Sequence, residues 1–426
     1  MKRTTLIITL LATWAIAGAQ LTLERCHQLA RENWPLIKQY GLIEQSSSYT
    51  LSNLMHSWLP QVNLSAQATY QSDVPSFPDQ MQAMLASSGL EMKGLAKDQY
   101  RIQADVSQRI FDGGKASSEK ALTIAQDAEL KAQTEVDLYA LNKRVDELFF
   151  GIILMDERVK QTNLTLEMLE GNLDKLQSHV RNGVATTADE SLLRAEIMTM
   201  QQNRDNMEWA RTSYRQMLEV MIGQSIAGQE LVKPHDIEPS TSVVNRPELR
   251  LIDARIGTLD AREKAINAQV MPVISLFGQA FYGYPGYNNF EAMINRKWSL
   301  NAMVGVRAQW SLSSLYDRKN NLSKLSTARQ QAQLQRDVFL LNNRLEVVRE
   351  NNEISRLRQL IKSDATIVGL RSDVRRAEES KLRNGVIDIH RLVEKITEEN
   401  VAAQSQIIHN IELLKTIYEL KNTINQ

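Results

Sequence analysis

The sequence contains very little cysteine and, after its first residues, no long apolar run. Cys26 is the only cysteine among 426 residues, so no disulfide can form within the chain. We expect Cys26 to be a packed helix residue, because free cysteine is usually buried. No later stretch reaches the roughly 18 uncharged apolar residues that a membrane-spanning helix needs. If the chain enters a membrane, it must do so as β-strands.

An excess of charge of one sign is also missing, because 50 Lys and Arg residues balance 50 Asp and Glu residues. A balanced chain gives no electrostatic reason to expect nucleic acid as a partner. The sequence has no Gly-rich phosphate loop, no HExxH pattern and no nucleophile constellation. Its six histidines are scattered, and a single cysteine offers no recognisable zinc site. We therefore expect no enzyme, no cofactor and no bound metal.

The first nineteen residues have the pattern of a secretory signal peptide. Lys2 and Arg3 precede an apolar run over residues 6–17, and small residues at 17–19 form a cleavage site. We therefore predict a signal peptide over 1–19 and export of the chain that follows. The apolar run itself is too short to span a membrane as a helix.

The rest of the chain repeats itself. Pro35 in Asn-Trp-Pro-Leu matches Pro247 in Asn-Arg-Pro-Glu, and a second proline pair has the same spacing. Gly183 in Arg-Asn-Gly-Val matches Gly385 in the same four-residue string. Three anchors in one order predict a duplicated architecture in which each half is helix, strand, loop, strand, long helix, turn, long helix.

The anchors divide the chain into ranges. We expect a first repeat over 20–222, a linker over 223–246 and a second repeat over 247–426. Each repeat holds two strands and one long helical hairpin. In the first repeat we expect strands at 62–71 and 100–111 and a hairpin over 115–222 with its tip near 181–189. In the second repeat we expect strands at 273–282 and 298–312 and a hairpin over 315–426 with its tip near 383–390.

The expected strands alternate between apolar and polar residues, most regularly over 62–71. About ten alternating residues are typical of an outer-membrane strand with one face toward lipid and the other toward a lumen. A soluble sheet with one wet face gives the same alternation. Aromatic residues near the strand ends and long connections favour the membrane. The strand over 273–282 is the least regular, because Phe277 and Phe281 stand at its polar positions.

Four strands cannot close a membrane barrel. An open sheet edge in lipid would leave backbone groups without partners, so closure must come from other copies of the chain. Two copies give a bore that side chains largely fill, whereas three copies begin to leave a passage. A trimer is therefore the smallest assembly expected of a conduit.

Apolar residues from Leu138 to Val180 recur at alternating spacings of three and four, and Thr162 is the one polar member of this series. Such a series is a coiled-coil seam. A helix that begins near Lys115 and carries it would be roughly 100 Å long, at about 1.5 Å per residue.

The second hairpin is less regular. Its apolar heptads begin at Val338, are interrupted at Asn352 and Ser355, and resume at Ile367. An interrupted seam indicates weaker pairing, which would make this hairpin the moving part of a gated tunnel. A skewed register explains the same irregularity.

Three short strings accompany these features: Leu-Thr-Leu-Glu at 21–24, Ile-Phe-Asp-Gly-Gly at 110–114 and Asn-Arg-Pro-Glu-Leu at 245–249. With the duplication, they make the chain resemble the TolC-like outer-membrane efflux proteins, or outer membrane factors, over essentially all of its length after the signal. The resemblance implies an α+β fold in which four strands per chain form a trimeric twelve-stranded membrane β-barrel. That barrel continues into a long helical coiled-coil tunnel.

The resemblance also implies a location and a function. The barrel would lie in the outer membrane of a Gram-negative cell, in contact with lipid, and the tunnel would cross the periplasm. The homotrimer would give passive passage to substrates from an inner-membrane transporter of RND or ABC type, in a tripartite efflux or type I secretion system. A periplasmic adaptor, or membrane fusion protein, would be its further partner.

In that family the hairpin tips close the tunnel and contact the adaptor. The matching tip residues of this chain are Arg181, Asn182, Gly183, Val184, Asp189, Arg383, Asn384, Gly385, Val386 and Asp388. An aspartate pair narrows the entrance in the best-known members, whereas this chain has Arg391 and Glu394 at those positions. We therefore expect a mixed-charge entrance, in which these two residues could pair between neighbouring helices.

Two alternatives remain at this point. A periplasmic coiled-coil adaptor of a secretion or efflux machine shares the long hairpin, but it needs only one and usually carries a membrane anchor and compact β domains. A structural coiled-coil surface protein would not require the strand pairs. Two hairpins with four alternating strands favour the channel.

Overall fold

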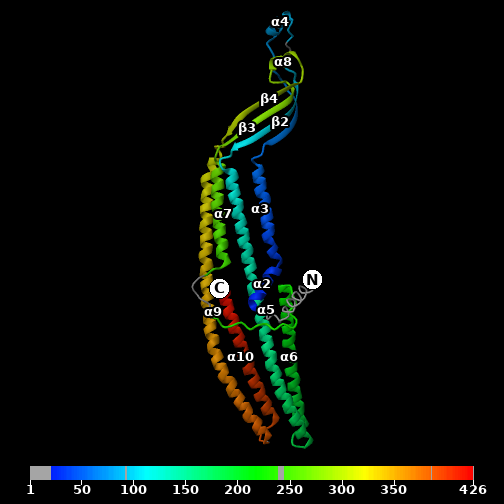
Figure 1. The fold of residues 1–426 in the computed structure, drawn as a ribbon, viewed down its shortest axis with the longest axis vertical. Helices are drawn as coiled ribbons and strands as arrows, with labels where there is room; N and C mark the ends of the chain where they lie inside the picture. The colour runs from blue at the N-terminus through cyan, green and yellow to red at the C-terminus, as the bar shows by residue number, and fades with distance from the viewer. Residues whose placement is uncertain (1–20, 92–93, 238–243, 385, 426) are drawn as a thin grey trace, which may run out of the picture. The chain divides into compact units, whose positions relative to one another are not determined.

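The computed structural model describes residues 21–425 apart from 92–93, 238–243 and 385, so the predicted signal peptide lies outside the described residues. The chain divides into two compact units (Figure 1). The helical unit comprises Met1–Tyr40, Ala132–Leu251 and Gln335–Gln426. The strand unit comprises Gly41–Lys131 and Ile252–Leu334.

Within the described residues, the strand unit contains one antiparallel sheet in the order β1-β2-β3-β4. Its strands are β1 (Gln61–Tyr70), β2 (Asp98–Phe111), β3 (Val273–Tyr284) and β4 (Ser299–Gln309). Strands β1 and β4 lie at the two edges, and among the described residues each is paired on one side only. The sheet of a single chain is therefore open.

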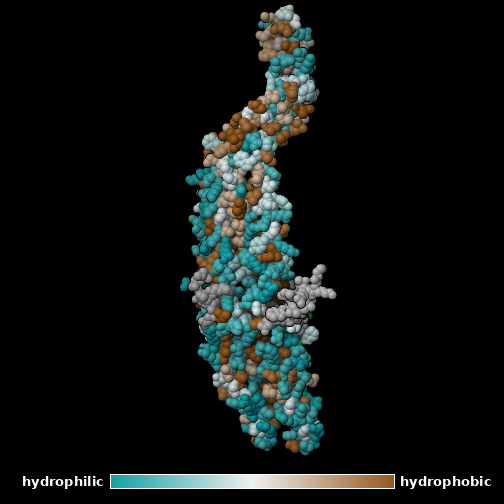
Figure 2. Space-filling model, in the orientation of Figure 1, coloured by the Kyte–Doolittle hydropathy of each residue, from teal (hydrophilic) through white to brown (hydrophobic). Residues whose placement is uncertain are grey.

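The strand register places apolar side chains of all four strands on one face. One cross-strand row consists of Leu64, Ala104, Ala280 and Ala302, and the row beside it ends at Val304. Leu64 is 77% exposed and Val304 is 87% exposed. Figure 2 shows apolar residues gathered over the strands. Within the described residues of the strand unit, this apolar face is exposed.

The opposite face of the sheet is polar, and it contains the two phenylalanines that make β3 irregular. The guanidinium of Arg101 lies 4.1 Å from the ring centroid of Phe281, and that of Arg307 lies 4.7 Å from the ring of Phe277. These are cation–π contacts. Gly305 lies opposite Phe277, and a Cβ at this position would come within 2.8 Å of the ring. The two phenylalanines thus contact arginine side chains of the polar face through their rings.

The strand unit also contains α4 (Asp79–Ser87) and α8 (Asn289–Ile294), together with most of α3 (Gln39–His56) and most of α7 (Pro247–Gln269). Two long helices, α5 (Lys115–Arg181) and α9 (Ser314–Arg383), contribute residues to both units. In the strand unit Arg329 of α9 pairs with Asp260 of α7 at 2.6 Å and with Glu263 at 2.5 Å. No helix in the described part of the chain is long and apolar enough to cross a membrane.

The Ile-Phe-Asp-Gly-Gly string forms the turn from β2 into α5. The buried carboxylate of Asp112 accepts hydrogen bonds from the backbone N–H groups of Gly114 at 2.8 Å and Ala116 at 2.7 Å. These N–H groups have no partner within the helix, so Asp112 acts as its cap. Gly113 has φ +70°, and the side chain of Met271 leaves no room there for a Cβ. The string therefore encodes a tight strand-to-helix junction.

The helical unit adds α2 (Leu23–Asn33), the short helix η1 (Pro35–Lys38), α6 (Thr187–Ile222) and α10 (Ile389–Ile424). The predicted α5 seam is confirmed as an interior surface that packs against α6 and α10, as in the cluster of Leu169, Leu193 and Leu392. Thr162 is buried in this interior surface. Its burial is tolerated because its hydroxyl accepts a hydrogen bond from Gln404 Nε2 of α10 at 3.1 Å. Cys26 is fully buried in α2, as expected.

Helix α9 carries two apolar stripes. Ile354 and Leu357 are buried against Leu413, Ile417 and Leu420 of α10. The stripe that the heptads predicted as the pairing seam is exposed instead, and it consists of Val338, Leu341, Leu345, Val348, Ile367, Leu370 and Val374. The expectation that this stripe pairs within the second hairpin is wrong, because another face of α9 meets α10. Its interruption says nothing about how tightly the hairpin is held.

Candidate functional site

The turn of the first hairpin is closed by backbone hydrogen bonds. The N–H of Gly183 donates to Val180 O at 3.0 Å, and the N–H of Val184 donates to His179 O at 2.9 Å. Gly183 has φ +72°, a conformation that glycine adopts without strain. Val184 itself is 74% exposed. The Asn-Gly signal therefore stops α5 and places an apolar side chain at the tip.

A capping box starts the return helix α6. The N–H of Asp189 donates to Thr186 Oγ1 at 3.2 Å, and the N–H of Thr186 donates to Asp189 Oδ2 at 3.0 Å. These reciprocal bonds satisfy donors that the helix leaves unpaired. The hydrogen bonds from Thr186 hold the pKa of the Asp189 carboxyl below its ordinary value. Asp189 therefore stabilises the start of α6 as the charged member of the capping box.

The second tip shares the backbone return and has a single aspartate as its cap. The N–H of Val386 donates to Lys381 O at 2.9 Å, the same five-residue return that Val184 makes. Asp388 caps α10 by accepting from Arg391 N at 3.0 Å. Val386 is 70% exposed. Arg383 and Asn384 end the outgoing arm, and Gly385 lies outside the described residues.

The two tips lie at the same end of the helical unit (Figure 1). A cavity of about 120 Å³ separates the hairpins beside them, lined by residues that include His179, Arg383 and Ile389. Lys175 Nζ of α5 lies 3.6 Å from Glu379 Oε1 of α9 in the same region. The structure thus places the two tips at one end of the helical unit, with Arg383 of the second tip beside the last turns of α5.

The predicted entrance residues form an ion pair within one helix. Arg391 Nη1 lies 2.9 Å from Glu394 Oε2, one turn along α10, and both side chains are exposed. A hydrogen bond from Lys395, with the nearby positive charges of Lys395 and Arg391, holds the pKa of Glu394 below its ordinary value. The pairing seen here is therefore within α10 rather than between helices.

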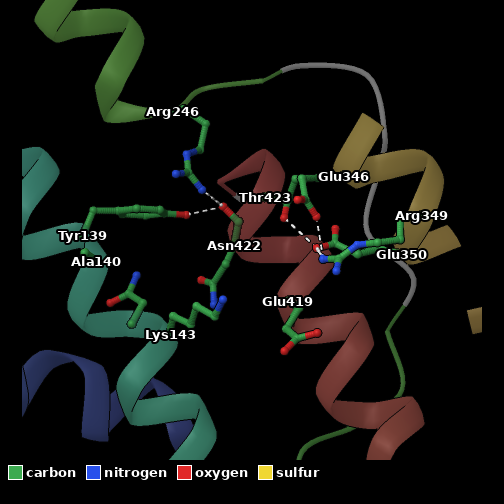
Figure 3. A pocket seen from close by; sticks show the side chains of 11 residues that line it. Tyr139, Ala140, Lys143, Arg246, Glu346, Arg349, Glu350, Glu419, Asn422 and Thr423 are labelled. Carbon is green, nitrogen blue, oxygen red and sulfur yellow. Dashed lines mark hydrogen bonds and ion pairs between the residues drawn. The ribbon is translucent and has the colours of Figure 1, made fainter. Parts of the chain in front are cut away.

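A second polar site lies in the helical unit around Asn422 of α10 (Figure 3). The backbone oxygen of Asn422 accepts hydrogen bonds from the Tyr139 hydroxyl of α5 at 2.7 Å and from Arg246 Nη1 at 2.8 Å. Arg246 also pairs with Glu248, and its guanidinium lies 4.7 Å from the Tyr139 ring centroid. The Asn-Arg-Pro-Glu string therefore fastens the segment before α7 to α5 and α10.

Comparison with solved structures shows where this fold occurs. A crystal structure of a membrane protein from Pseudomonas aeruginosa matches with a TM-score of 0.68 at 14% identity, over 94% of this chain and 90% of that one. The outer membrane protein VceC of Vibrio cholerae matches with a TM-score of 0.65 at 11% identity, over 94% and 95% of the two chains. The open MtrE outer membrane channel of Neisseria gonorrhoeae matches with a TM-score of 0.64 at 14% identity, over 94% and 88%.

No known family profile and no curated protein sequence matches the chain. At such low identities, likeness over nearly the whole length shows the fold. The chain therefore has the fold of outer-membrane channel proteins, and the expected α+β class with four strands and long helical hairpins is confirmed. The two-repeat division of the sequence stays a prediction.

Sequence reasoning identified the tips but missed the residues around Asn422. The Asn-Gly strings carry a backbone signal that local physics explains. Tyr139, Glu350 and Thr423 lie on three different helices, and they meet only after the helices pack. The one usable signal is Arg246, which belongs to the Asn-Arg-Pro-Glu string.

Proposed function

We propose that the chain is the outer-membrane subunit of a tripartite efflux or type I secretion channel. The observation that carries this proposal is the exposed apolar face that runs across all four strands of an open sheet, in a chain that also has long helical hairpins. A contiguous apolar face that runs across four strands requires a partner, and lipid is the partner that alternating outer-membrane strands meet. The fold shared with outer-membrane channels supports the same location.

The two sheet edges support a ring of identical subunits. Pairing β4 of one copy with β1 of the next is a head-to-tail contact, which closes into a ring when the rotation fits. Three copies supply twelve strands and leave a passage. The exposed α9 stripe, from Val338 to Val374, offers each neighbour a second apolar contact surface. We therefore propose a homotrimer.

The polar face of the sheet would then line the passage. It presents the charged residues Arg101, Asp105, Arg109 and Arg307 beside uncharged polar residues and the two phenylalanines of β3. Such a lining suits passive movement of substrates rather than chemistry on them. We propose that an inner-membrane transporter of RND or ABC type delivers those substrates.

The hairpin tips are the proposed contact for a periplasmic adaptor. Val184 and Val386 each project an exposed apolar side chain from a turn held by backbone hydrogen bonds. Charged residues, among them Arg181 and Asp189 at the first tip and Asp388 at the second, stand close to them in the sequence, and an apolar centre with a polar rim is typical of a protein interface. The similar structures with a stated role are outer-membrane channels, so the alternative that this chain is itself an adaptor gains no support.

A pair of arginine substitutions on adjacent residues of β1 tests the membrane assignment. Leu64→Arg places a charge on the apolar face, at a cost of about 2–4 kcal/mol near the centre of a bilayer. Ser65→Arg places the same charge on the polar face. We expect Ser65→Arg to give a heat-labile trimer in the outer membrane and Leu64→Arg to lose it. Recovery of the unaltered chain as a soluble periplasmic monomer would overturn the proposal.

A further inference from the structure

Glu350 of α9 is a buried carboxyl group with one oxygen that lacks a partner. Only 5% of the residue is exposed. Its Oε1 accepts a hydrogen bond from the Thr423 hydroxyl of α10 at 3.0 Å. Among the described residues, Oε2 has no hydrogen-bond partner and is shielded from solvent. A carboxylate in this position would be a buried charge with half of its acceptors unused.

The neighbouring cations do not neutralise this carboxyl group. Arg349 lies 3.6 Å from Oε1, but its guanidinium is mostly exposed and makes a closer pair with Glu346 at 2.5 Å. On the side of the unit drawn in Figure 3, Arg246 is engaged with Glu248 and with the Asn422 backbone. Lys143 of α5 is exposed at the rim of the same cavity.

The remaining titratable neighbours are Glu419 of α10 and Tyr139 of α5. Burial, with the negative charges of Glu346 and Glu419, raises the pKa of Glu350 to about 7, and the Thr423 hydrogen bond and Arg349 offset only part of this. Tyr139 keeps its proton, since burial raises the pKa of that hydroxyl to about 12. Glu350 therefore titrates near neutral pH.

Glu350 stands at the contact between α9 and α10. On one side of it Asn343 Nδ2 donates to the Thr423 backbone oxygen at 2.6 Å. On the other side Ile354 and Leu357 pack against α10. A cavity of about 480 Å³ lies beside the carboxyl group and has room for water. A small movement of α9 could therefore bring the carboxyl group into contact with water.

We propose that Glu350 is a proton-binding site that controls the packing of α9 on α10. Oε2 is shielded from water while the helices are packed, so no solvent stabilises a negative charge on it. A bound proton removes that charge. The neutral acid tolerates its burial, whereas the ionised carboxylate must reach water to be solvated. Protonation thus holds the two helices together, and ionisation loosens this part of the second hairpin. The inference concerns a single chain and does not depend on the proposed channel function.

The direction of the pH effect follows from the two states. In packed helices the pKa is about 7, against an ordinary value of 4.5 once the group is solvated. The packed state therefore binds the proton more tightly, and its advantage is fully present at low pH and lost as pH rises through 7. Between pH 6 and pH 8 this linkage increases the population of the open state about tenfold.

Hydrogen exchange of the full-length protein in detergent tests the proposal. Exchange is measured at pH 6 and pH 8 and corrected for the intrinsic pH dependence of amide exchange. We expect peptides over 343–357 and 413–423 to lose about tenfold in protection at pH 8. Peptides from the α5–α6 tip should not change. Equal corrected protection at both pH values in the unaltered protein would overturn the proposal, and this measurement needs no variant.

Two variants test whether Glu350 causes the pH dependence of protection. Glu350→Gln keeps the size of the side chain and cannot ionise, so its protection should be independent of pH. Glu346→Gln removes a neighbouring exposed carboxyl group and should keep most of the pH dependence of the unaltered protein. An infrared band of a protonated carboxyl group, present at pH 6, lost at pH 8 and missing from Glu350→Gln, would confirm the bound proton directly. Retention of the full pH dependence in Glu350→Gln would contradict the assignment.

Discussion

The hydroxyl of Tyr139 in α5 donates a hydrogen bond to the backbone oxygen of Asn422 in α10 at 2.7 Å, across 283 residues of sequence. Arg246 donates to the same oxygen, so one carbonyl group near the end of α10 receives two donors. That carbonyl lies in the last turn of the helix, where acceptors have no partner within the helix. The contact thus satisfies a helix end and connects three segments at once.

Removing the hydroxyl tests the contribution of this contact. We expect Tyr139→Phe to destabilise the helical unit by about 1 kcal/mol, because one hydrogen bond is lost while the ring remains. Tyr49→Phe is the matched control, since Tyr49 is exposed on α3. The temperature at which the assembled protein dissociates on a gel should fall for the first variant and not for the second. An equal effect of both substitutions would contradict a specific role for the contact.

The capping box at the first tip gives a local prediction. Thr186→Ala should cost about 1 kcal/mol, because the N–H of Asp189 loses its acceptor. Hydrogen exchange should become faster in the first turn of α6 and stay unchanged elsewhere. Thr187→Ala, one residue further along, removes a hydroxyl that does not form the cap. Slow exchange in that turn of Thr186→Ala would show that the cap is dispensable.

Cysteines at the tips test the adaptor contact. Val184→Cys and Val386→Cys should react readily with a maleimide, because both positions are exposed. Cys26 should not react, since burial raises the pKa of its thiol to about 12 and the thiolate is the reactive form. The native cysteine can therefore stay in place as an internal control. In cells, cross-linkers on these two cysteines should capture a periplasmic adaptor. A cysteine at Ser65, on the sheet, should capture none.

Charge at the predicted entrance can be tested electrically. We expect the double substitution of Arg391 and Glu394 by alanine to change single-channel conductance or ion selectivity in a planar bilayer, because it removes two exposed charges of α10. Substituting the exposed pair Lys160 and Glu157 of α5 serves as a control with the same change in charge. Unchanged conductance and selectivity in the first variant would count against the entrance assignment.

The hydrogen bond from Thr423 sets the pH at which Glu350 titrates. This bond lowers the pKa of the carboxyl group. Thr423→Val should therefore move the loosening of α9 and α10 to a higher pH. Thr416→Val is the matched control, since the Thr416 hydroxyl bonds to the backbone of its own helix. Hydrogen exchange across a pH series would compare the two midpoints, and a midpoint that moves down in Thr423→Val would contradict the assignment.

Local patterns predicted much of this fold. Alternation of apolar and polar residues identified β1, and the heptads from Leu138 to Val180 identified the interior face of α5. In both elements the spacing of the apolar residues matches the spacing of side chains on a single face. The sequence of one chain is therefore enough to identify that face. The Asn-Gly string at 182–183 likewise marked the end of α5, because Gly183 adopts a left-handed conformation and such a residue stops a helix.

The same reasoning failed where a helix has two apolar faces. The heptads of α9 that begin at Val338 form an apolar stripe on either side of their interruption, yet this stripe is exposed in the single chain. Periodicity shows that a face is apolar, and it does not show which partner covers it. The environment of Glu350 was equally hidden, because its burial depends on α10, which lies about seventy residues further along the sequence.

The matched edges of the sheet have a genetic consequence. Strands β1 and β4 have 10 and 11 residues, so a copy can offer one full edge to each neighbour. In the proposed ring, a copy damaged at one edge can still be recruited through its intact edge and then prevents closure. Edge substitutions should therefore be dominant in cells that also make the unaltered protein. Substitutions that merely unfold the chain should be recessive.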